Sequence, residues 1–402
     1  MEERSGLLEI KAWFGHAGAG SDELQDWDKE DFNCCNWGYS VACDSTTNRV
    51  IGLHLSGVND GALGKDLYLN ASLFLPFNEL EYLDLSQNHL VCGLKNQGTI
   101  GLRGLRKLEV LYLGSSDFKE NILLESLGGL PSLKTLSASG SKFEGKHFGK
   151  GLCNSTSLEE MYLQDSSLPA SFLGNIGTTL KVLSLTGVDF HGTSPAQGWC
   201  ELKNLERLYL GRNNLKGVLP PCLGNLSSLI CLDLSDNQFE GNIAFSHLSH
   251  LPQLEDLSIS NNYFQVPVSF GSFMNLSNLK HIECDNNELV PASSFQPSVP
   301  KLQLRFFSAS RCTSKLLNDG FPSFLHSQSD LVFVDLSHNK FNGEPFPSWL
   351  VENNTKLNEL YLRNTSFIGP LQLPQNPRPN LETIDLHASK ENRELFNILS
   401  GN

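Results

Sequence analysis

Several side chains in this sequence are of types that do chemistry, but their spacing does not assemble a catalytic site. Asp233, Asp335 and Asp385 recur at one position of a repeat, many repeats apart, whereas the paired acids of glycosidases lie about 5–9.5 Å apart. His247 and His250 lack a third candidate ligand, and no cysteine pair has C-x-x-C spacing, so no metal site is expected. The H-E-x-x-H, phosphate-loop, EF-hand and G-x-S-x-G motifs are absent. We expect neither an enzyme nor a bound cofactor.

The cysteines are the other reactive group. The stretch DFNCCNWGYSVAC, residues 31–43, puts Cys34 beside Cys35, with Cys43 farther along. A disulfide needs its two Cα atoms well over about 4 Å apart, so neighbouring cysteines rarely bond to each other. Cys34 and Cys35 therefore need different partners, and Cys43 can serve only one of them.

Four later cysteines are interpreted by their place in the repeat described below. Cys200 and Cys222 fall at similar places on adjacent turns, where a bridge and two free thiols are equally open outcomes. Cys284 takes a buried leucine position and Cys312 an asparagine position. Both are expected to be small thiols of the core rather than a bridge.

Composition and charge indicate the compartment and exclude two kinds of partner. The 402 residues include 30 Lys and Arg against 44 Asp and Glu, a formal charge of −14, which opposes nucleic acid or an anionic membrane surface as partner. The sequence has no apolar run long enough to span a bilayer and no apolar signal core at its N-terminus. Clustered cysteines and N-x-S/T sequons still favour an extracellular protein. The predicted glycosylation sites are Asn70, Asn154, Asn225, Asn275, Asn353 and Asn364.

A repeat with a period of about 25 residues organises the chain. Each copy has the form L-x-x-L-x-L-x-x-N-x-F/L. The alternating leucines have the period of a strand buried on one face, and the inward asparagine can satisfy backbone groups of the turn. Because one copy cannot bury its own apolar edge, the copies must stack. They begin at Leu80, Leu108, Leu133, Leu158, Leu180, Leu205, Leu229, Leu254, Leu279, Leu304, Leu331, Leu357 and Leu381, after a half-copy at Val50.

This pattern resembles the leucine-rich repeat, and NNLKGVLPPCLGNLSSL (213–229) resembles its plant-type form. The resemblance implies an α/β repeat solenoid, a right-handed superhelix with a parallel β-sheet on its concave face. It also implies that Gly217 turns the chain into a second short strand. Where Val188, Cys312 and Thr365 replace the asparagine, we expect the second strand to be lost and the coil to be irregular.

The amino end, with EERSGLLEIKAWF and the CCNW and VAC segments, resembles the N-terminal cap of plant leucine-rich-repeat receptor-like proteins. The resemblance divides the chain into a disulfide cap over 1–48 and about thirteen to fourteen repeats over 49–402, the last incomplete. It implies a Cys35–Cys43 bridge. A partner for Cys34 would then lie upstream of Met1, and the alternatives are a bridge to Cys92 or a free thiol.

Outward strand positions form columns on the concave face, and these columns supply the candidate binding residues. Tyrosine and arginine offer large contact areas with hydrogen-bonding tips, as in interface hot spots. The alternative for any single one of these residues is that it is an ordinary solvent-exposed residue of a strand, with no binding role. The candidates are Tyr112, Tyr162, Arg207, Tyr209, Arg212, Asp233, Glu283, Phe306, Arg311, Phe333 and Tyr361, among which Tyr162, Arg207, Tyr209 and Arg212 are expected to cluster.

The function that the resemblance implies is recognition at the extracellular face of the plant plasma membrane. The chain would be an N-terminal part of a receptor-like protein ectodomain. It would bind a peptide, protein or glycan and signal, in immunity, through adaptor and co-receptor receptor kinases. The alternative is a secreted inhibitor of cell-wall-degrading enzymes, similar to polygalacturonase-inhibiting proteins. Ligand identity is beyond the sequence, because a repeat face can be adapted to many targets.

Overall fold

The computed structural model shows a chain built from two units, Met1–Leu205 (unit 1) and Glu206–Asn402 (unit 2). Each unit consists of coils that add one strand to a main sheet and, in many coils, one strand to a second sheet. The structure describes residues 2–16, 24–27, 33–59, 67–92, 102, 104–118, 127, 129–143, 156–169, 172, 176–191, 198–291, 301–313, 321–341, 344–367 and 380–387.

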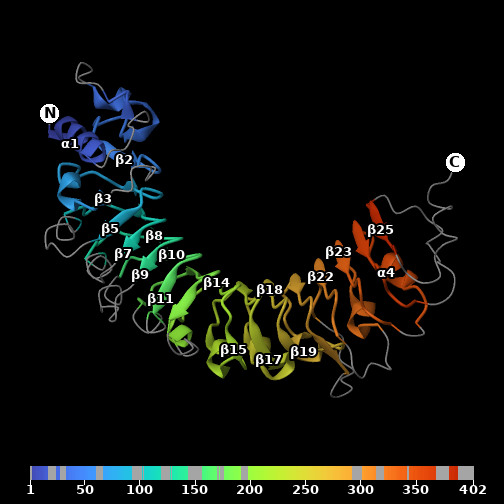
Figure 1. Ribbon diagram of the computed structural model, residues 1–402. Helices are drawn as coiled ribbons and strands as arrows, with labels where there is room; N and C mark the ends of the chain where they lie inside the picture. The colour runs from blue at the N-terminus through green and yellow to red at the C-terminus, as the bar shows by residue number, and fades with distance from the viewer. Residues whose placement is uncertain are drawn as a thin grey trace, which may run out of the picture. The chain divides into compact units, whose positions relative to one another are not determined.

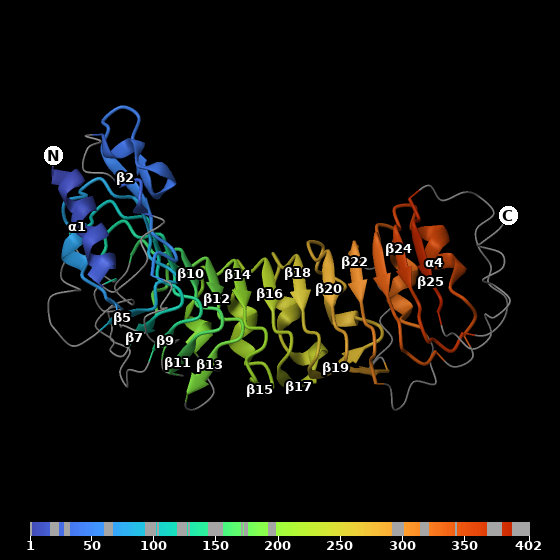
Figure 2. The ribbon, with the colours of Figure 1, turned by 45° about the horizontal axis from the view of Figure 1, so that its top comes forward.

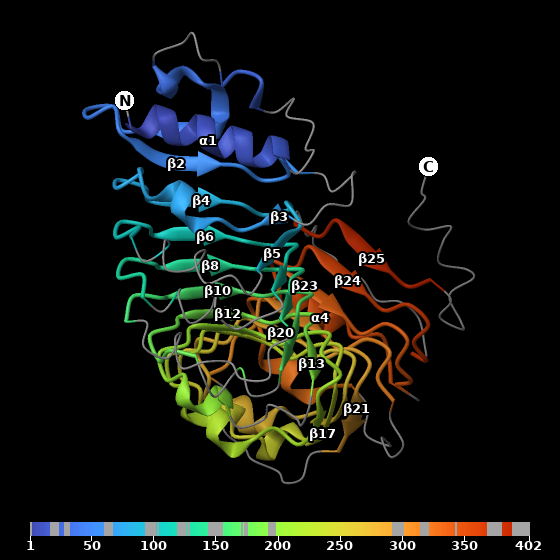
Figure 3. The same cartoon turned by 60° about the vertical axis from the view of Figure 1, so that its left-hand side comes forward.

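The main sheet of unit 1 starts with an antiparallel pair, β1 (Val41–Cys43) and β2 (Val50–His54). Every later strand runs parallel to its predecessor and in register with it, and Figure 3 shows these strands side by side. The central residue of each faces the interior and is buried, as the leucine period predicts. The later strands are β4 (Tyr82–Asp84), β6 (Val110–Tyr112), β8 (Thr135–Ser137), β10 (Glu160–Tyr162) and β12 (Val182–Ser184).

The main sheet of unit 2 is parallel and in register between each of its neighbouring strands (Figure 2). Its central residues, from Leu208 to Leu360, are again buried. The strands are β14 (Arg207–Tyr209), β16 (Cys231–Asp233), β18 (Asp256–Ser258), β20 (His281–Glu283), β22 (Phe306–Ser308), β23 (Phe333–Asp335), β24 (Glu359–Tyr361) and β25 (Thr383–Asp385).

Each unit also has a second parallel sheet, of which Figure 1 labels β3, β5, β7, β9 and β11 in unit 1 and β15, β17 and β19 in unit 2. In unit 1 it comprises β3 (Leu67–Tyr68), β5 (Leu90–Cys92), β7 (Asp117–Phe118), β9 (Lys142–Phe143), β11 (Ser167–Pro169) and β13 (Asp189–His191). In unit 2 it comprises β15 (Lys216–Gly217), β17 (Gln238–Asn242), β19 (Tyr263–Pro267) and β21 (Glu288–Val290).

Gly217 and Gly241 lie in these second-sheet strands with φ of +83° and +96°, which a side chain would strain, so the predicted turn is confirmed there. The expectation of a lost strand after Val188 is wrong, because β13 follows it directly and pairs with β11. After Cys312, only an isolated bridge from Thr313 to Glu288 remains among the described residues.

The cap of unit 1 packs helix α1 (Glu2–His16) against the first coils. Leu7, Ile10 and Phe14 are fully buried, and a side chain at Gly6 would come within 3.1 Å of the Phe77 ring, so only glycine permits this close approach. Short helical segments complete the coils: η2 (Cys34–Asn36), η3 (Gly38–Ser40), η4 (Ala71–Phe74), η7 (Gly198–Glu201), η8 (Pro221–Asn225), η9 (Ile243–Phe245), η10 (Leu248–His250), η11 (Gly271–Phe273), η12 (Ser323–Ser327) and α4 (Ser348–Asn353).

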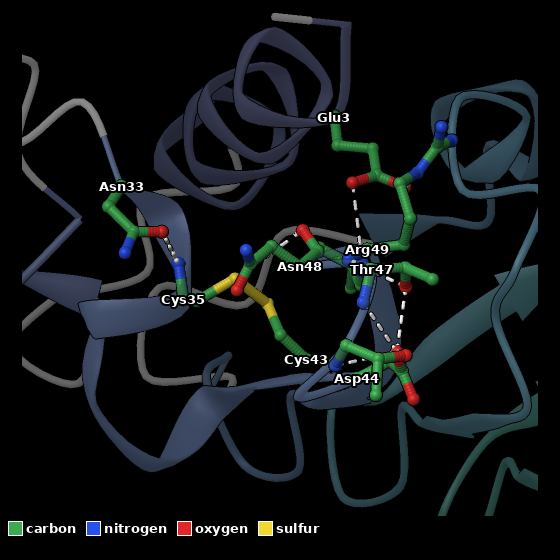
Figure 4. Close-up of a disulfide and its surroundings, with 10 residues drawn as sticks. Glu3, Asn33, Cys35, Cys43, Asp44, Thr47, Asn48 and Arg49 are labelled. Carbon is green, nitrogen blue, oxygen red and sulfur yellow. Dashed lines mark hydrogen bonds and ion pairs between the residues drawn. A yellow bond between two sulfur atoms is a disulfide. The ribbon is translucent and has the colours of Figure 1, made fainter.

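The Cys35–Cys43 disulfide is confirmed (Figure 4). Cys34 is a buried free thiol, so the alternative bridge to Cys92 is wrong. Cys284 and Cys312 are buried and free, as expected of core thiols. Cys200 and Cys222 are both disulfide-bonded, which removes free thiols as an outcome for them.

Buried polar side chains satisfy the turns that follow the main-sheet strands. The inward asparagines are confirmed: Asn88, Asn213, Asn237, Asn262, Asn287 and Asn339 are all buried. Asn237 is typical, because its Nδ2 donates to three carbonyls at 2.8–3.1 Å and its Oδ1 accepts from two backbone amides at 2.9 and 3.2 Å. In unit 1, Ser116, Ser141 and Ser166 take the same position, a substitution that the sequence pattern did not identify.

Candidate ligand-binding face

We define the main-sheet face of each unit as the first and third residues of its main-sheet strands, which point away from the buried central residue. On unit 2 most of these side chains are half-buried or exposed, as strand β14 illustrates: Arg207 is exposed and Tyr209 half-buried. Ser308 is an exception, since its hydroxyl donates to Asp285 at 2.6 Å and the residue is buried. Because the strands are in register, equivalent residues of neighbouring coils lie beside each other.

An aromatic stack, consisting of His281, Phe306 and Phe333, crosses the middle of this face. The His281 and Phe306 rings are parallel within 5° with centroids 4.0 Å apart, and the Phe306 and Phe333 rings are parallel within 1° at 4.2 Å. Tyr361 lies next to the stack, 5.6 Å from Phe333 and tilted by 44°. Register causes this stacking, because the three rings stand on the first residues of adjacent parallel strands.

Beside the stack lies a hollow of about 370 Å³, here named the aromatic hollow. Its apolar lining comes from the stack and Val332, and two cationic residues, Lys280 and Arg305, also line it. The Lys280 ammonium donates to the carbonyls of Ser277 and Gln303 at 3.2 and 3.1 Å, which holds it in place. The guanidinium of Arg305 is exposed and makes no ion pair with the residues that the structure describes.

A second hollow, of about 290 Å³, adjoins the first and is here named the acidic hollow. Asp233, Asp256 and Glu283 line it together with Tyr209 and Cys231, and neither lysine nor arginine does. Asp256 and His281 line both hollows, so the two are neighbours on this face.

Hydrogen bonds set the charge of the acidic hollow. The His281 Nε2 atom lies 3.0 Å from a Glu283 oxygen, and this contact holds the pKa of Glu283 below its ordinary value. Asp233 accepts from the Ser235 amide at 2.9 Å. Burial raises the pKa of the Cys231 thiol, which is therefore neutral. At neutral pH the acidic hollow is thus negatively charged.

The main-sheet face of unit 1 is different in kind. Tyr82 and Tyr112 meet edge to face at 5.6 Å, and burial together with nearby Asp84 raises the pKa of Tyr82 to about 12. The Tyr162 hydroxyl donates to Glu160 at 3.2 Å, so this tyrosine is tied to its own strand. His54 packs on Tyr82 at 4.5 Å, β8 carries only Thr135 and Ser137 on this face, and Ser184 is buried.

The predicted binding residues are divided between the two units. Tyr112 and Tyr162 lie in unit 1, whereas Arg207, Tyr209 and Arg212 lie in unit 2, so the predicted four-residue cluster is not brought together within either unit. Within unit 2 the predicted Phe306 and Phe333 are in contact, as are Phe333 and Tyr361, and Asp233 and Glu283 share the acidic hollow.

Two predicted arginines sit away from the strand faces, and four residues of the hollows were missed. Arg212 and Arg311 occupy turns with φ of 60° and 54°, a left-handed conformation that arginine rarely adopts. The missed residues are Asp256, Lys280, His281 and Arg305. Asp256 and His281 do stand in an outward column that the repeat predicts, one residue before the buried residue of a strand, but they are not among the predicted binding residues.

The sequons stay predictions, but their places are defined. Asn70, Asn225, Asn275, Asn353 and Asn364 are exposed, and Asn154 lies outside the described residues. Asn225 and Asn353 each end a helical segment of their coil. Asn364 follows β24 and its amide lies 3.4 Å from the His338 ring.

The described residues offer neither a metal site nor a membrane-spanning helix. In the described part of the chain, no three His, Cys, Asp or Glu side chains are grouped so that they could hold a metal ion. The same residues include no helix whose length and apolar character would let it cross a bilayer.

Sequence comparisons identify related proteins. The Leucine Rich Repeat family profile matches residues 204–226. Receptor-like protein 9b of Arabidopsis thaliana is 35% identical over 405 residues, covering 98% of this chain and 40% of that protein. Cuscuta receptor 1 of Solanum lycopersicum is 39% identical over 181 residues, covering 45% of this chain and 16% of that protein. The chain thus spans well under half the length of these relatives.

Structural comparisons give the same fold. The leucine-rich-repeat ectodomain of the plant membrane receptor kinase GASSHO1/SCHENGEN3 from Arabidopsis thaliana, solved with CASPARIAN STRIP INTEGRITY FACTOR 2, is 29% identical with a TM-score of 0.64. That match covers 90% of this chain and 44% of the other. The Arabidopsis receptor kinase HAESA, solved with the peptide hormone IDA and the co-receptor SERK1, is 27% identical with a TM-score of 0.60. It covers 89% of this chain and 61% of the other.

Proposed function

The chain belongs to the leucine-rich-repeat proteins and is related along nearly its whole length to plant receptor-like proteins, and from that premise we propose that it recognises an extracellular ligand as part of a receptor ectodomain. The single observation that carries this proposal is the main-sheet face of unit 2. There, half-buried aromatic rings and charged side chains line two neighbouring hollows. Such groups are the ones that dominate interface energetics.

Binding, rather than catalysis, is the role that this face supports. The carboxylates of the face lie on a strand surface beside aromatic side chains. The Cys231 thiol in the acidic hollow is neutral, because burial raises the pKa of this thiol. A neutral thiol is a poor nucleophile. The proposed place of action is the outer face of the plasma membrane.

The proposal extends to signalling partners. The HAESA complex contains both a peptide hormone and a co-receptor. We propose an equivalent arrangement here, with immunity as the setting. Ligand-dependent co-precipitation of the full-length protein with a co-receptor kinase tests it, and ligand-independent or absent co-precipitation contradicts it.

Affinity capture from plant extracellular fluid tests the recognition role itself. The complete ectodomain should retain a ligand that a variant with Arg207→Ala, Tyr209→Ala and Phe333→Ala loses, because those side chains supply contact area on one face. Tyr39→Ala is the matched control, since Tyr39 is a fully exposed aromatic residue of the cap, away from the main-sheet face. Equal capture by all three proteins would overturn the proposed function.

A further inference from the structure

The two hollows of unit 2 differ in chemistry but share a boundary, and this combination narrows the class of ligand. Asp256 and His281 line both, so one ligand can occupy the two hollows at once. Volumes of about 370 and 290 Å³ lie at the small end of ligand sites. They suit single side chains of an extended segment better than a compact molecule.

We propose that this site binds a peptide segment carrying a cationic side chain for the acidic hollow and an aromatic or apolar side chain for the aromatic hollow. The inference rests on the proposed recognition function and specifies its ligand.

The acidic hollow selects for positive charge. Three carboxylates, from Asp233, Asp256 and Glu283, line it without any lysine or arginine. Glu283 is kept ionised by its contact with His281, and Asp256 makes no ion pair with any residue that the structure describes. A cation placed among them is attracted by all three carboxylates, of which only Glu283 contacts a basic side chain among the described residues.

The aromatic hollow selects for an apolar group. Phe306 and Phe333 are half-buried and leave ring surface toward the hollow, where an apolar side chain can bury it. Lys280 and Arg305 border this hollow, so a second cation is repelled there. The cation of the ligand is therefore directed to the acidic hollow and the apolar group to the aromatic stack.

Strand geometry sets the spacing of the two groups. Asp256 and Phe306 stand at the same position of β18 and β22, which are separated by β20, so the centres of the hollows lie roughly 10 Å apart. A ligand in the polyproline II conformation covers that distance in about three residues, and its side chains return to the same side at every third residue. The ligand pattern is thus a cationic residue and an apolar residue about three positions apart.

Synthetic peptides test the inference on the whole chain. The probe is the capped hexapeptide Gly-Arg-Gly-Gly-Phe-Gly, compared with versions that carry Glu for Arg or Ser for Phe, and with an octamer of galacturonic acid as an anionic oligosaccharide. Calorimetry or fluorescence anisotropy gives the affinities. We expect the Arg and Phe peptide to bind about tenfold more tightly than either altered peptide, and the oligosaccharide not to displace it.

Variants locate the effect. Asp256→Asn should abolish the preference for Arg over Glu, and Phe306→Ser should abolish the preference for Phe over Ser. Glu160→Gln is the matched control, because Glu160 is the first residue of a main-sheet strand in unit 1 and should change neither. Circular dichroism and thermal unfolding establish that all variants fold.

Three results would overturn the inference: no peptide binding, tighter binding of the Glu peptide, or displacement by the oligosaccharide. These results are distinguishable from failure of the proposed function. If face substitutions abolish capture of the natural ligand while the peptides show the wrong preference, only the ligand class is wrong. If face substitutions leave capture unchanged, the recognition role itself is wrong.

Discussion

Unit 1 and unit 2 repeat the same coil, but three coils of unit 1 fill its buried polar position with serine where most coils of unit 2 have asparagine. Asn237 in unit 2 makes five hydrogen bonds to the backbone of its own and neighbouring coils. Ser141 in unit 1 makes two, donating to a carbonyl at 3.4 Å and accepting from an amide at 3.2 Å. The Ser116 hydroxyl has no partner in the described structure. The coil therefore tolerates a smaller polar residue, but the hydrogen bonds between its turns are then fewer and weaker.

The outer faces of the units differ in a related way. Unit 2 presents a stack of three parallel rings and two hollows, whereas Tyr82 and Tyr112 of unit 1 meet edge to face. A tyrosine bonded to a carboxylate of its own strand occurs in both units, at Tyr162 and at Tyr361. A strongly connected interior under an adaptable face is the arrangement that a binding scaffold requires. Within unit 2, stability and recognition are therefore expected to respond to substitutions at different positions, the buried asparagines and the main-sheet face.

The largest expected effect compares the two buried positions directly. Asn237→Ala should destabilise the coils around it by about 3 kcal/mol, because carbonyls and amides lose their partners in a dry interior. Ser141→Ala should cost about 1 kcal/mol, since two long hydrogen bonds are lost. Hydrogen exchange of amides in each unit measures both values. Equal losses at the two sites would contradict the difference between the units.

A smaller effect is expected from the cap of unit 1. The Cys35–Cys43 bridge closes a loop with a sequence separation of 8, so Cys43→Ser should reduce the stability of the first coils by about 2.5 kcal/mol. In a solenoid each coil contacts its neighbours, and exchange protection around β20 in unit 2 should stay unchanged. Cys231→Ser, at a free thiol, is the control. Loss of protection throughout the chain would show that the units do not respond separately.

The sequence predicted most of the fold because the pattern that builds it is local. Alternating leucines define the buried face of each main-sheet strand, and the inward asparagines were identified by type and spacing. The serines of unit 1 were missed, because Ser141 and Ser166 look like decay of the pattern although they still bond to the turns. The strand β13 after Val188 was also missed, because its pairing with β11 does not depend on an asparagine at position 188.

The candidate site was predicted only in part. Phe306, Phe333, Asp233 and Glu283 were found by column, since register places equivalent residues side by side. The hollows also need Lys280 and Arg305, which stand just before their strands, outside the alternating pattern. Ring stacking depends on side-chain rotamers, which the sequence does not fix.

The smallest expected effects have opposite signs in the two units and concern two aspartates. Asp44, between β1 and β2 in Figure 4, accepts from the amides and hydroxyls of Thr46 and Thr47, and these bonds depress its pKa. Burial raises the pKa of Asp285 in unit 2, although Ser308 and Ser310 donate to it.

The signs follow from linkage. A depressed folded pKa gives Asp44 a contribution that is present above the ordinary aspartate pKa of about 4 and is lost as the pH falls through the folded value. A raised folded pKa means that native Asp285 holds its proton more tightly than the unfolded chain does. Stability is then lost as the pH rises from about 4 through the raised value.

Replacing each aspartate by asparagine separates the two cases. The destabilisation caused by Asp44→Asn should grow between about pH 3 and pH 5, because only the wild type has an ionisable Asp44 whose contribution to stability increases over that range. As the pH rises over the same range, Asp285→Asn should become more stable relative to the wild type. Asparagine still accepts the serine hydrogen bonds and carries no charge to bury. Urea unfolding followed by local hydrogen exchange, from pH 3 to pH 7, measures both. If the stability difference changes with pH in the same direction at both sites, burial does not control the pKa of Asp285. The proposed contrast between an exposed cap loop and a tightly packed coil would then be wrong.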